Sequence, residues 1–138
     1  MRRKDREIKE FDGIIDVLSR CKVLHLALIS EGKKLDAIKV NPQVSFCAET
    51  SVETSGPENS PEDACKWTCF YESVIGFGTA SLVEDAKERT AGLDSIMFHN
   101  GYKMPPGIKT IAYNAMTLAH TAVIKIEVSE ITGKRHLK

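Results

Sequence analysis

The sequence lacks an excess of charge of either sign, because 19 lysines and arginines balance 19 aspartates and glutamates. Nucleic-acid-binding domains usually carry a basic excess on one face, so we expect no nucleic-acid partner. No stretch approaches the roughly 18 apolar residues of a membrane span, and residues 1–20 hold no apolar run of the kind found in a secretory signal. These absences predict a cytoplasmic protein with no membrane partner.

Common catalytic motifs are also missing. The sequence contains no Gly-x-Ser-x-Gly elbow, no His-Glu-x-x-His and no Walker phosphate loop. Its four histidines are scattered. The Cys65-x-x-x-Cys69 spacing is not that of a zinc knuckle, and no second pair completes four ligands. We therefore expect reduced thiols in a cytosolic setting and no metal site.

The 138 residues fit one domain, 1–138, large enough to bury a core without disulfides. Apolar spacing and turn residues predict helices over residues 4–20, 32–41, 84–99 and 108–118, strands over 23–29, 44–48, 69–83 and 121–128, and a loop over 50–63. The strand over 23–29 is expected to be buried, and the helix over 84–99 to point Ala86, Leu93, Ile96 and Met97 inward. Regular βαβ alternation is absent, so the pattern favours an α+β fold with a small antiparallel barrel or sheet.

Two local patterns are candidates for binding. Gly32, Lys33 and Lys34 open the short predicted helix, where free backbone N–H groups and two ammonium groups would suit a phosphate; a solvated basic turn explains the same residues. The run Ser73-Val74-Ile75-Gly76-Phe77-Gly78 places glycines on a long strand, which leaves room for a flat ring or marks a bend in a barrel. The residues alone leave both alternatives open.

These patterns, in this order, resemble the pyridoxamine-phosphate-oxidase-like flavoproteins, and within them the branch of nitroimidazole-resistance proteins. The resemblance covers nearly the whole chain. It includes Met1 to Glu7, Leu26 to Ile29, Glu31 to Asp36 with Asn41-Pro42, Ala64 to Thr68, Ser73 to Gly78, and Val123 to Arg135. Each motif is weak alone, and together they are specific.

The resemblance implies a split β-barrel with peripheral helices that binds FMN at a homodimer interface. The residues matching its cofactor-binding positions are Gly32, Lys33, Lys34, Trp67, Thr68, Ser73, Val74 and Ile75. It assigns no catalytic side chain. The implied activity is an oxidoreductase acting on small molecules such as nitroimidazole-like or pyridoxamine-phosphate-like compounds.

The chain departs from the family at two places. Ile29 runs straight into Ser30, Glu31 and Gly32, so a hairpin of about thirty residues that supplies two barrel strands is lacking. Glu72 stands where relatives often carry a basic residue. The missing hairpin keeps two alternatives open, a module that holds a flavin or another phosphate-bearing ligand without turnover, and a degenerate dimerisation domain.

Overall fold

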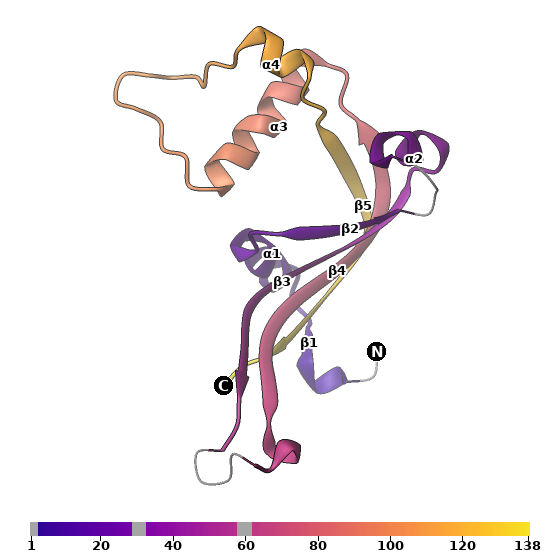
Figure 1. Cartoon of the computed structure of the whole chain (residues 1–138), viewed down its shortest axis with the longest axis vertical. Helices are drawn as coiled ribbons and strands as arrows, with labels where there is room; N and C mark the ends of the chain where they lie inside the picture. Colours follow the sequence, from indigo (N-terminus) through magenta and orange to yellow (C-terminus); the bar gives the residue numbers. More distant parts are fainter. Residues whose placement is uncertain (1–2, 29–32, 58–61) are drawn as a thin grey trace.

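The structure is a computed structural model that describes residues 3–28, 33–57 and 62–138. Its strands form one antiparallel sheet in the order β1-β5-β4-β3-β2 (Figure 1). Because β1 and β2 are the two edges, the sheet is open and does not close into a complete barrel. The α+β class is as predicted, and an open sheet is the expected result of a barrel that lacks one hairpin.

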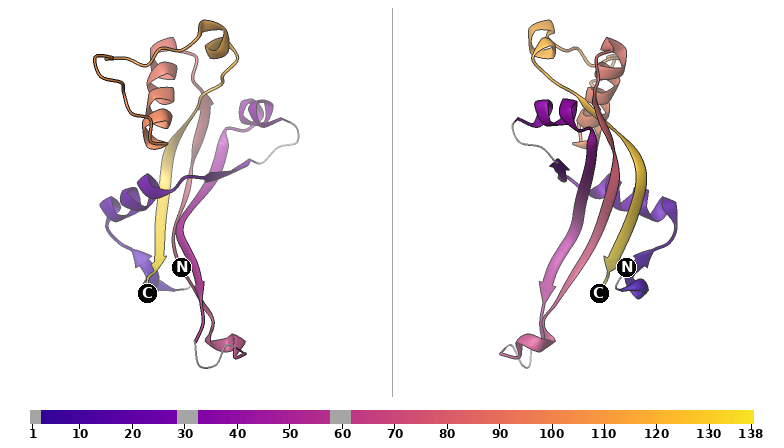
Figure 2. Two further views of the ribbon diagram at one scale, coloured as in Figure 1. Left: turned by 60° about the vertical axis from the view of Figure 1, so that its left-hand side comes forward. Right: turned by 90° about the vertical axis from the view of Figure 1, so that its right-hand side faces the viewer.

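The elements follow the chain as η1 (Lys4–Arg6), β1 (Glu7–Ile8), α1 (Phe11–Arg20), β2 (Leu24–Leu28), α2 (Lys34–Val40), β3 (Gln43–Ser55), η2 (Ala64–Lys66), β4 (Thr68–Leu82), α3 (Ala86–His99), α4 (Ala115–Ala119) and β5 (Ile124–His136). The long strands β3, β4 and β5 run side by side along the longest axis (Figure 2). The tip of the β3–β4 hairpin lies at one end of the sheet, and α2, α3 and α4 lie at the other (Figure 1).

The core lies on one face of the sheet, under α1 and α2. Residues at even positions of β3 and β4 point to this face, since side chains alternate along a strand. Two clusters form there. The first joins Ile8, Ile14, Val17, Cys21, Phe46, Ala48 and Val74, and the second joins Ile38, Val44 and Ala80. Burial of this apolar stripe, at about 25 cal/mol per Å², holds both helices on the sheet.

The helix predicted over 4–20 begins only at Phe11, so the prediction was wrong at its start. Glu7 and Ile8 instead pair with β5 opposite Lys134 and Gly133, and this pairing overrides local helix propensity. Gly13 lies inside α1, because a Cβ there would sit 2.8 Å from the buried Ile8 side chain. The glycine lets the helix approach the short strand.

The loop predicted over 50–63 was also wrong in its first half. β3 continues to Ser55, and Glu53, Thr54 and Ser55 pair with the start of β4. Both faces of this arm are largely exposed to solvent. The sequence there therefore shows no apolar alternation, and a strand could not be predicted from its polar residues.

Further differences concern the C-terminal half. The helix predicted over 108–118 is confined to α4, because the Asn114 side chain accepts hydrogen bonds from the backbone N–H groups of Met116 and Thr117 and so caps the helix there. The strand predicted over 121–128 is β5, which begins at Ile124 and continues to His136 because it pairs with β4 along its length and with β1 on its other edge. α3 is confirmed as a helix.

The inward-facing positions predicted on α3 were wrong, because α3 buries none of its residues. Leu93 is half-buried, and Ala86, Ile96 and Met97 are exposed. The helix lies at the end of the sheet (Figure 1), where the Nε2 atom of its last residue, His99, lies 2.7 Å from the carbonyl oxygen of Cys21, and its apolar side chains remain exposed or only half-buried.

Candidate functional site

The face of the sheet opposite α1 carries a patch that no helix of the described residues covers. His25, Cys47 and Ile75 stand in one row across β2, β3 and β4, and Ala27, Ser45 and Phe77 form the next row. These six side chains, named here the open face, line a shallow hollow of about 250 Å³. Ile75 is 46% exposed and Phe77 is 48% exposed. An apolar surface of this kind marks a place where a ligand or a partner binds.

The open face corrects one expectation about β2. The strand predicted as buried is exposed or half-buried at every described position. Its apolar run indicated burial on both sides, but only the side of Leu26 packs against the core. The other side, with His25 and Ala27, belongs to the open face.

Part of the open face was predicted from the sequence. Ile75 was among the predicted site residues, whereas His25, Ala27, Ser45, Cys47 and Phe77 were not. Alternation along residues 43–49 and 73–79 places the odd positions on one face. What the alternation does not reveal is which of the two faces the helices cover.

The two predicted lysines lie at the start of α2. Lys33 is the residue before the helix and Lys34 is its first residue, and both side chains are exposed. Neither ammonium group makes an ion pair within residues 3–28, 33–57 and 62–138. α2 has only seven residues, so any attraction for a phosphate must come mainly from the two charges. Gly32 lies outside the described residues.

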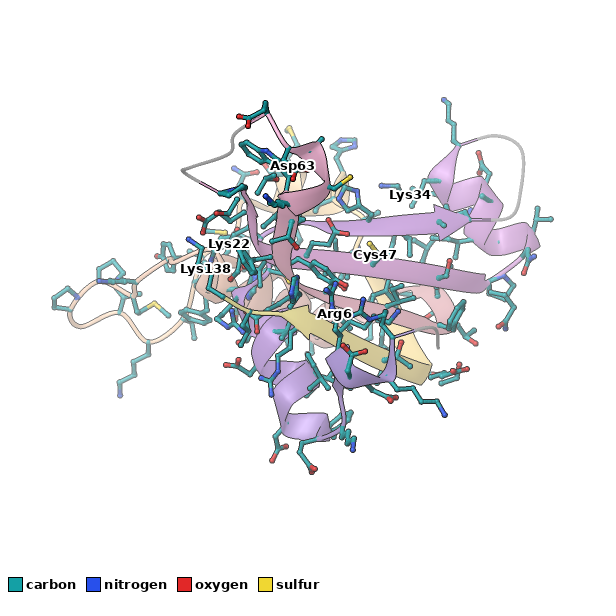
Figure 3. All side chains as sticks on the ribbon, turned by 90° about the horizontal axis from the view of Figure 1, so that it is seen from below. Arg6, Lys22, Lys34, Cys47, Asp63 and Lys138 are labelled. Carbon is teal, nitrogen blue, oxygen red and sulfur yellow. The ribbon has the colours of Figure 1, made fainter. Side chains whose placement is uncertain are left out.

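The predicted residues of β4 divide between the two faces. Ser73 and Ile75 point to the same face as the hollow, and Ser73 stands between Glu49 and Lys134. Val74 is fully buried in the core, so only its backbone is available to a ligand on the open face. Figure 3 shows Cys47 on the side of the sheet away from α1 and Arg6.

The glycines of this strand have structural explanations. A Cβ on Gly76 would lie 2.3 Å from the Phe46 ring, and one on Gly78 would lie 2.3 Å from the carbonyl oxygen of Glu127. Gly78 lies at the register shift between β4 and β5. The room at Gly76 is therefore filled by the chain's own aromatic ring, and Gly78 marks the bend that was the alternative interpretation.

Trp67 and Thr68 lie at the hairpin end of the sheet. Trp67 follows η2, packs its ring against Gly56 and is 47% exposed, while Thr68 begins β4 opposite Ser55. The thirteen residues of β3 extend about 40 Å at roughly 3.3 Å per residue. One chain therefore does not bring Trp67 and Thr68 to the lysines of α2.

The described cysteines are all free thiols. Cys21 is buried under α1, and this burial raises the pKa of its thiol. No group of three or more metal-binding side chains occurs among the residues that the structure describes. Within the same residues, no helix is long and apolar enough to cross a membrane.

The fold belongs to the split-barrel class, with its sheet left open. The profile of the pyridoxamine 5'-phosphate oxidase family matches residues 23–135, and the chain belongs to this family. The predicted resemblance to this family is confirmed.

Three solved structures share the fold at low sequence identity. One, from Bacteroides thetaiotaomicron and described as a candidate 5-nitroimidazole antibiotic resistance protein, has a TM-score of 0.69 and 16% identity over 93% of this chain and 85% of its own. The flavocytochrome Anf3 of Azotobacter vinelandii gives 0.75 and 14% over 100% and 72%. An FAD and heme binding protein of Mycobacterium smegmatis gives 0.70 and 14% over 94% and 73%. No curated protein sequence matches this chain.

Proposed function

We propose that this protein is a flavoprotein that binds FMN between two copies of the chain. Membership of the pyridoxamine 5'-phosphate oxidase family supports this, as do structural neighbours described as a flavocytochrome and as an FAD and heme binding protein. The observation that carries the proposal is the open face, an exposed apolar patch on a rigid sheet. A flat flavin ring is an apolar surface of the kind that such a patch accepts.

In this proposal the predicted site residues divide between two copies. Lys33 and Lys34 lie at one end of the sheet, and Trp67 and Thr68 lie at the other (Figure 1). A two-fold partner lying antiparallel would bring the second pair to the first, since in an isologous interface residue i of one subunit contacts residue j of the other and residue j contacts residue i. Lys33 and Lys34 would bind the phosphate, and Ser73 and Ile75 would lie beside the ring.

The activity proposed is that of an oxidoreductase acting on small molecules such as nitroimidazole-like or pyridoxamine-phosphate-like compounds. When bound, the flavin supplies the redox chemistry, and the protein supplies binding, orientation and exclusion of water. Ile75 and Phe77 would exclude water from one face of the ring. No side chain of this chain is assigned a proton-transfer role.

The lysines provide the test. Each charge-assisted contact contributes roughly 1.5–3 kcal/mol, so Lys33→Ala with Lys34→Ala should weaken FMN binding about a hundredfold or more, since 1.4 kcal/mol is tenfold. Riboflavin, which has no phosphate, should bind both proteins equally. Flavin fluorescence titrations measure both ligands. As a control, Lys103→Ala with Lys109→Ala removes the same charge from the segment between α3 and α4, where both lysines are exposed.

Two outcomes would contradict the proposal. Equal losses for FMN and riboflavin would mean that the lysines only support the fold. Absence of binding of either ligand to the wild type would favour a degenerate dimerisation domain.

The open sheet specifically favours a second candidate, a module that holds the flavin without turnover. A flavin-loaded protein that fails to oxidise NAD(P)H with a nitro-aromatic acceptor would favour that candidate.

A further inference from the structure

A second cavity lies at the end of the sheet occupied by α2, α3 and α4, away from the hollow of the open face. Its volume is about 570 Å³, within the range of small-molecule sites. Leu35 and Lys39 of α2 form one wall, Arg89 of α3 another, and residues 119–123 before β5 a third. Apolar groups from Leu82, Val83 and Val123 line its interior.

Arg89 is an arginine without a partner at this cavity. Its side chain is partly buried, and its Nε atom is fully buried with no hydrogen-bond acceptor. Buried donors are nearly always paired in proteins, and an unpaired buried charge is strongly unfavourable. The Nε atom itself is out of solvent contact, whereas the side chain as a whole is only partly buried, so a ligand in the cavity would meet the guanidinium through its exposed atoms.

Two of the neighbouring carboxylates, those of Asp85 and Glu88, are engaged elsewhere. Asp85 caps α3 by accepting hydrogen bonds from the N–H groups of Lys87 and Glu88, and the Glu88 carboxylate pairs with Lys125 at 2.9 Å. Arg89 forms no ion pair in the parts of the chain that the structure describes. The only acidic side chain among the lining residues is Glu84, against the cationic Lys39 and Arg89 and the titratable His120. The cavity therefore presents a net positive charge beside apolar walls.

We propose that this cavity binds the oxyanion group, a carboxylate or a phosphate, of a small molecule with an apolar body. The planar guanidinium of Arg89 matches both oxyanions through two parallel hydrogen bonds, and Lys39 adds a second charge at the rim. Leu82, Val83 and Val123 receive the apolar body. The site uses none of the residues assigned to the flavin, so it stands independently of the proposed function.

The probes are benzoate and phenyl phosphate, which share a ring and differ in the oxyanion. They are added to the 138-residue protein with and without excess FMN, so that the result does not depend on whether the lysines of α2 bind the flavin. The signal of the Arg89 Nε–H group in an ¹⁵N-¹H NMR spectrum reports a change in the surroundings of the guanidinium, and calorimetry gives the affinity. At least one probe should shift this signal saturably with a Kd of about 1 mM or tighter, and the stronger probe identifies the oxyanion.

Matched variants test the assignment. Arg89→Met should weaken the stronger probe at least tenfold, and Lys39→Met should weaken it several-fold. Glu84→Gln should strengthen binding, because it removes the one acidic group from the lining. Lys87→Gln is the control, since it removes the same charge from the same turn of α3 at an exposed position outside the cavity.

Stability separates a binding role from a structural one. Because Arg89 has no acceptor, Arg89→Met should leave the thermal midpoint unchanged or raise it. A lowered midpoint together with no saturable shift of the wild-type Nε–H signal would overturn the proposal, as would equal losses of binding in Arg89→Met and Lys87→Gln. If Arg89→Met does not fold, opposite effects of Lys39→Met and Glu84→Gln support the site, and unchanged binding in both overturns it.

Discussion

Glu72 is a buried acidic residue in the middle of the sheet, with only 6% of its surface exposed. Arg20, at the end of α1, donates two hydrogen bonds to its carboxylate at 2.6 and 3.0 Å. The hydroxyl of Ser51 donates a third hydrogen bond to the Glu72 carboxylate, at 3.3 Å. Ser51 lies at the register shift of β3. The acidic residue that departs from the family pattern therefore joins α1 to β3 and β4.

This arrangement has an electrostatic consequence. The hydrogen bonds from Arg20 hold the pKa of Glu72 below its ordinary value, against the opposing effect of burial. A carboxylate whose pKa is lower in the folded state stabilises the fold at pH values above its unfolded pKa of about 4.3. That stabilisation is lost as the pH falls through the folded pKa.

We predict that Glu72→Gln lowers the free energy of unfolding by roughly 1.5–3 kcal/mol at pH 7. The difference from wild type should shrink as the pH falls below about 4, because the protonated wild-type side chain then resembles glutamine. Urea denaturation across this pH range measures both effects. Asp16→Asn is the control, since it removes the exposed partner of the same arginine and surface pairs contribute about 0–1 kcal/mol. A pH-independent difference would contradict the assignment.

At the scale of elements, the packing of β3 against β4 depends on a glycine, Gly76, which has no side chain. Gly76 faces Phe46 directly across the strands, and the Phe46 ring fills the space that a Cβ would need. Phe46 is 5% exposed and belongs to the main core cluster. The glycine therefore allows the two strands to pack closely. Because the core is close-packed, a shift of the backbone there would displace Phe46 and its neighbours.

We predict that Gly76→Ala destabilises the protein by about 1–3 kcal/mol, the usual effect of overpacking. Phe46→Leu also destabilises alone, because it leaves a cavity. Combining the two should recover part of the loss, since the smaller side chain makes room for the new methyl group. Thermal unfolding of the three variants gives the interaction energy of this cycle. Additive losses would mean that the clash is relieved elsewhere.

The sequence predicted helix ends where a capping or helix-breaking residue marks them. α2 ends before Asn41-Pro42 and α3 begins at the cap formed by Asp85, as the sequence indicates. The pairing of Ile8 with Gly133 was not predictable, because it joins residues from opposite ends of the chain. The arm from Thr50 to Ser55 was missed since neither of its faces is buried.

At the scale of the whole molecule, apolar surface remains exposed in several places. They include the open face with Ile75 and Phe77, and α3, where Ile96 and Phe98 are exposed. Large exposed patches are unusual on monomers. The proposed site needs residues from two copies of the chain. A single sequence carries no direct signal of how two copies are arranged. The family resemblance alone pointed to it.

The homodimer leads to a prediction about the open face. Phe77→Lys places a charge in the patch that the partner and the flavin are proposed to cover. We place Phe77 among the hot-spot residues of this interface, which cost about 2 kcal/mol or more when they are lost, so the dimer should weaken about thirtyfold or more. Sedimentation at micromolar concentration should show a dimer for wild type and a shift to monomer for Phe77→Lys, with loss of FMN binding in the same variant.

Phe98→Lys is the matched control for this experiment. Phe98 on α3 and Phe77 on β4 are both 48% exposed, so the two substitutions alter similarly exposed rings on different surfaces. Circular dichroism checks that both variants fold. Because α3 lies beyond the end of the sheet (Figure 1), Phe98→Lys should leave both the dimer and FMN binding unchanged. A monomeric wild type, or equal effects of the two substitutions, would show that the open face is not the surface on which the flavin and the second copy meet.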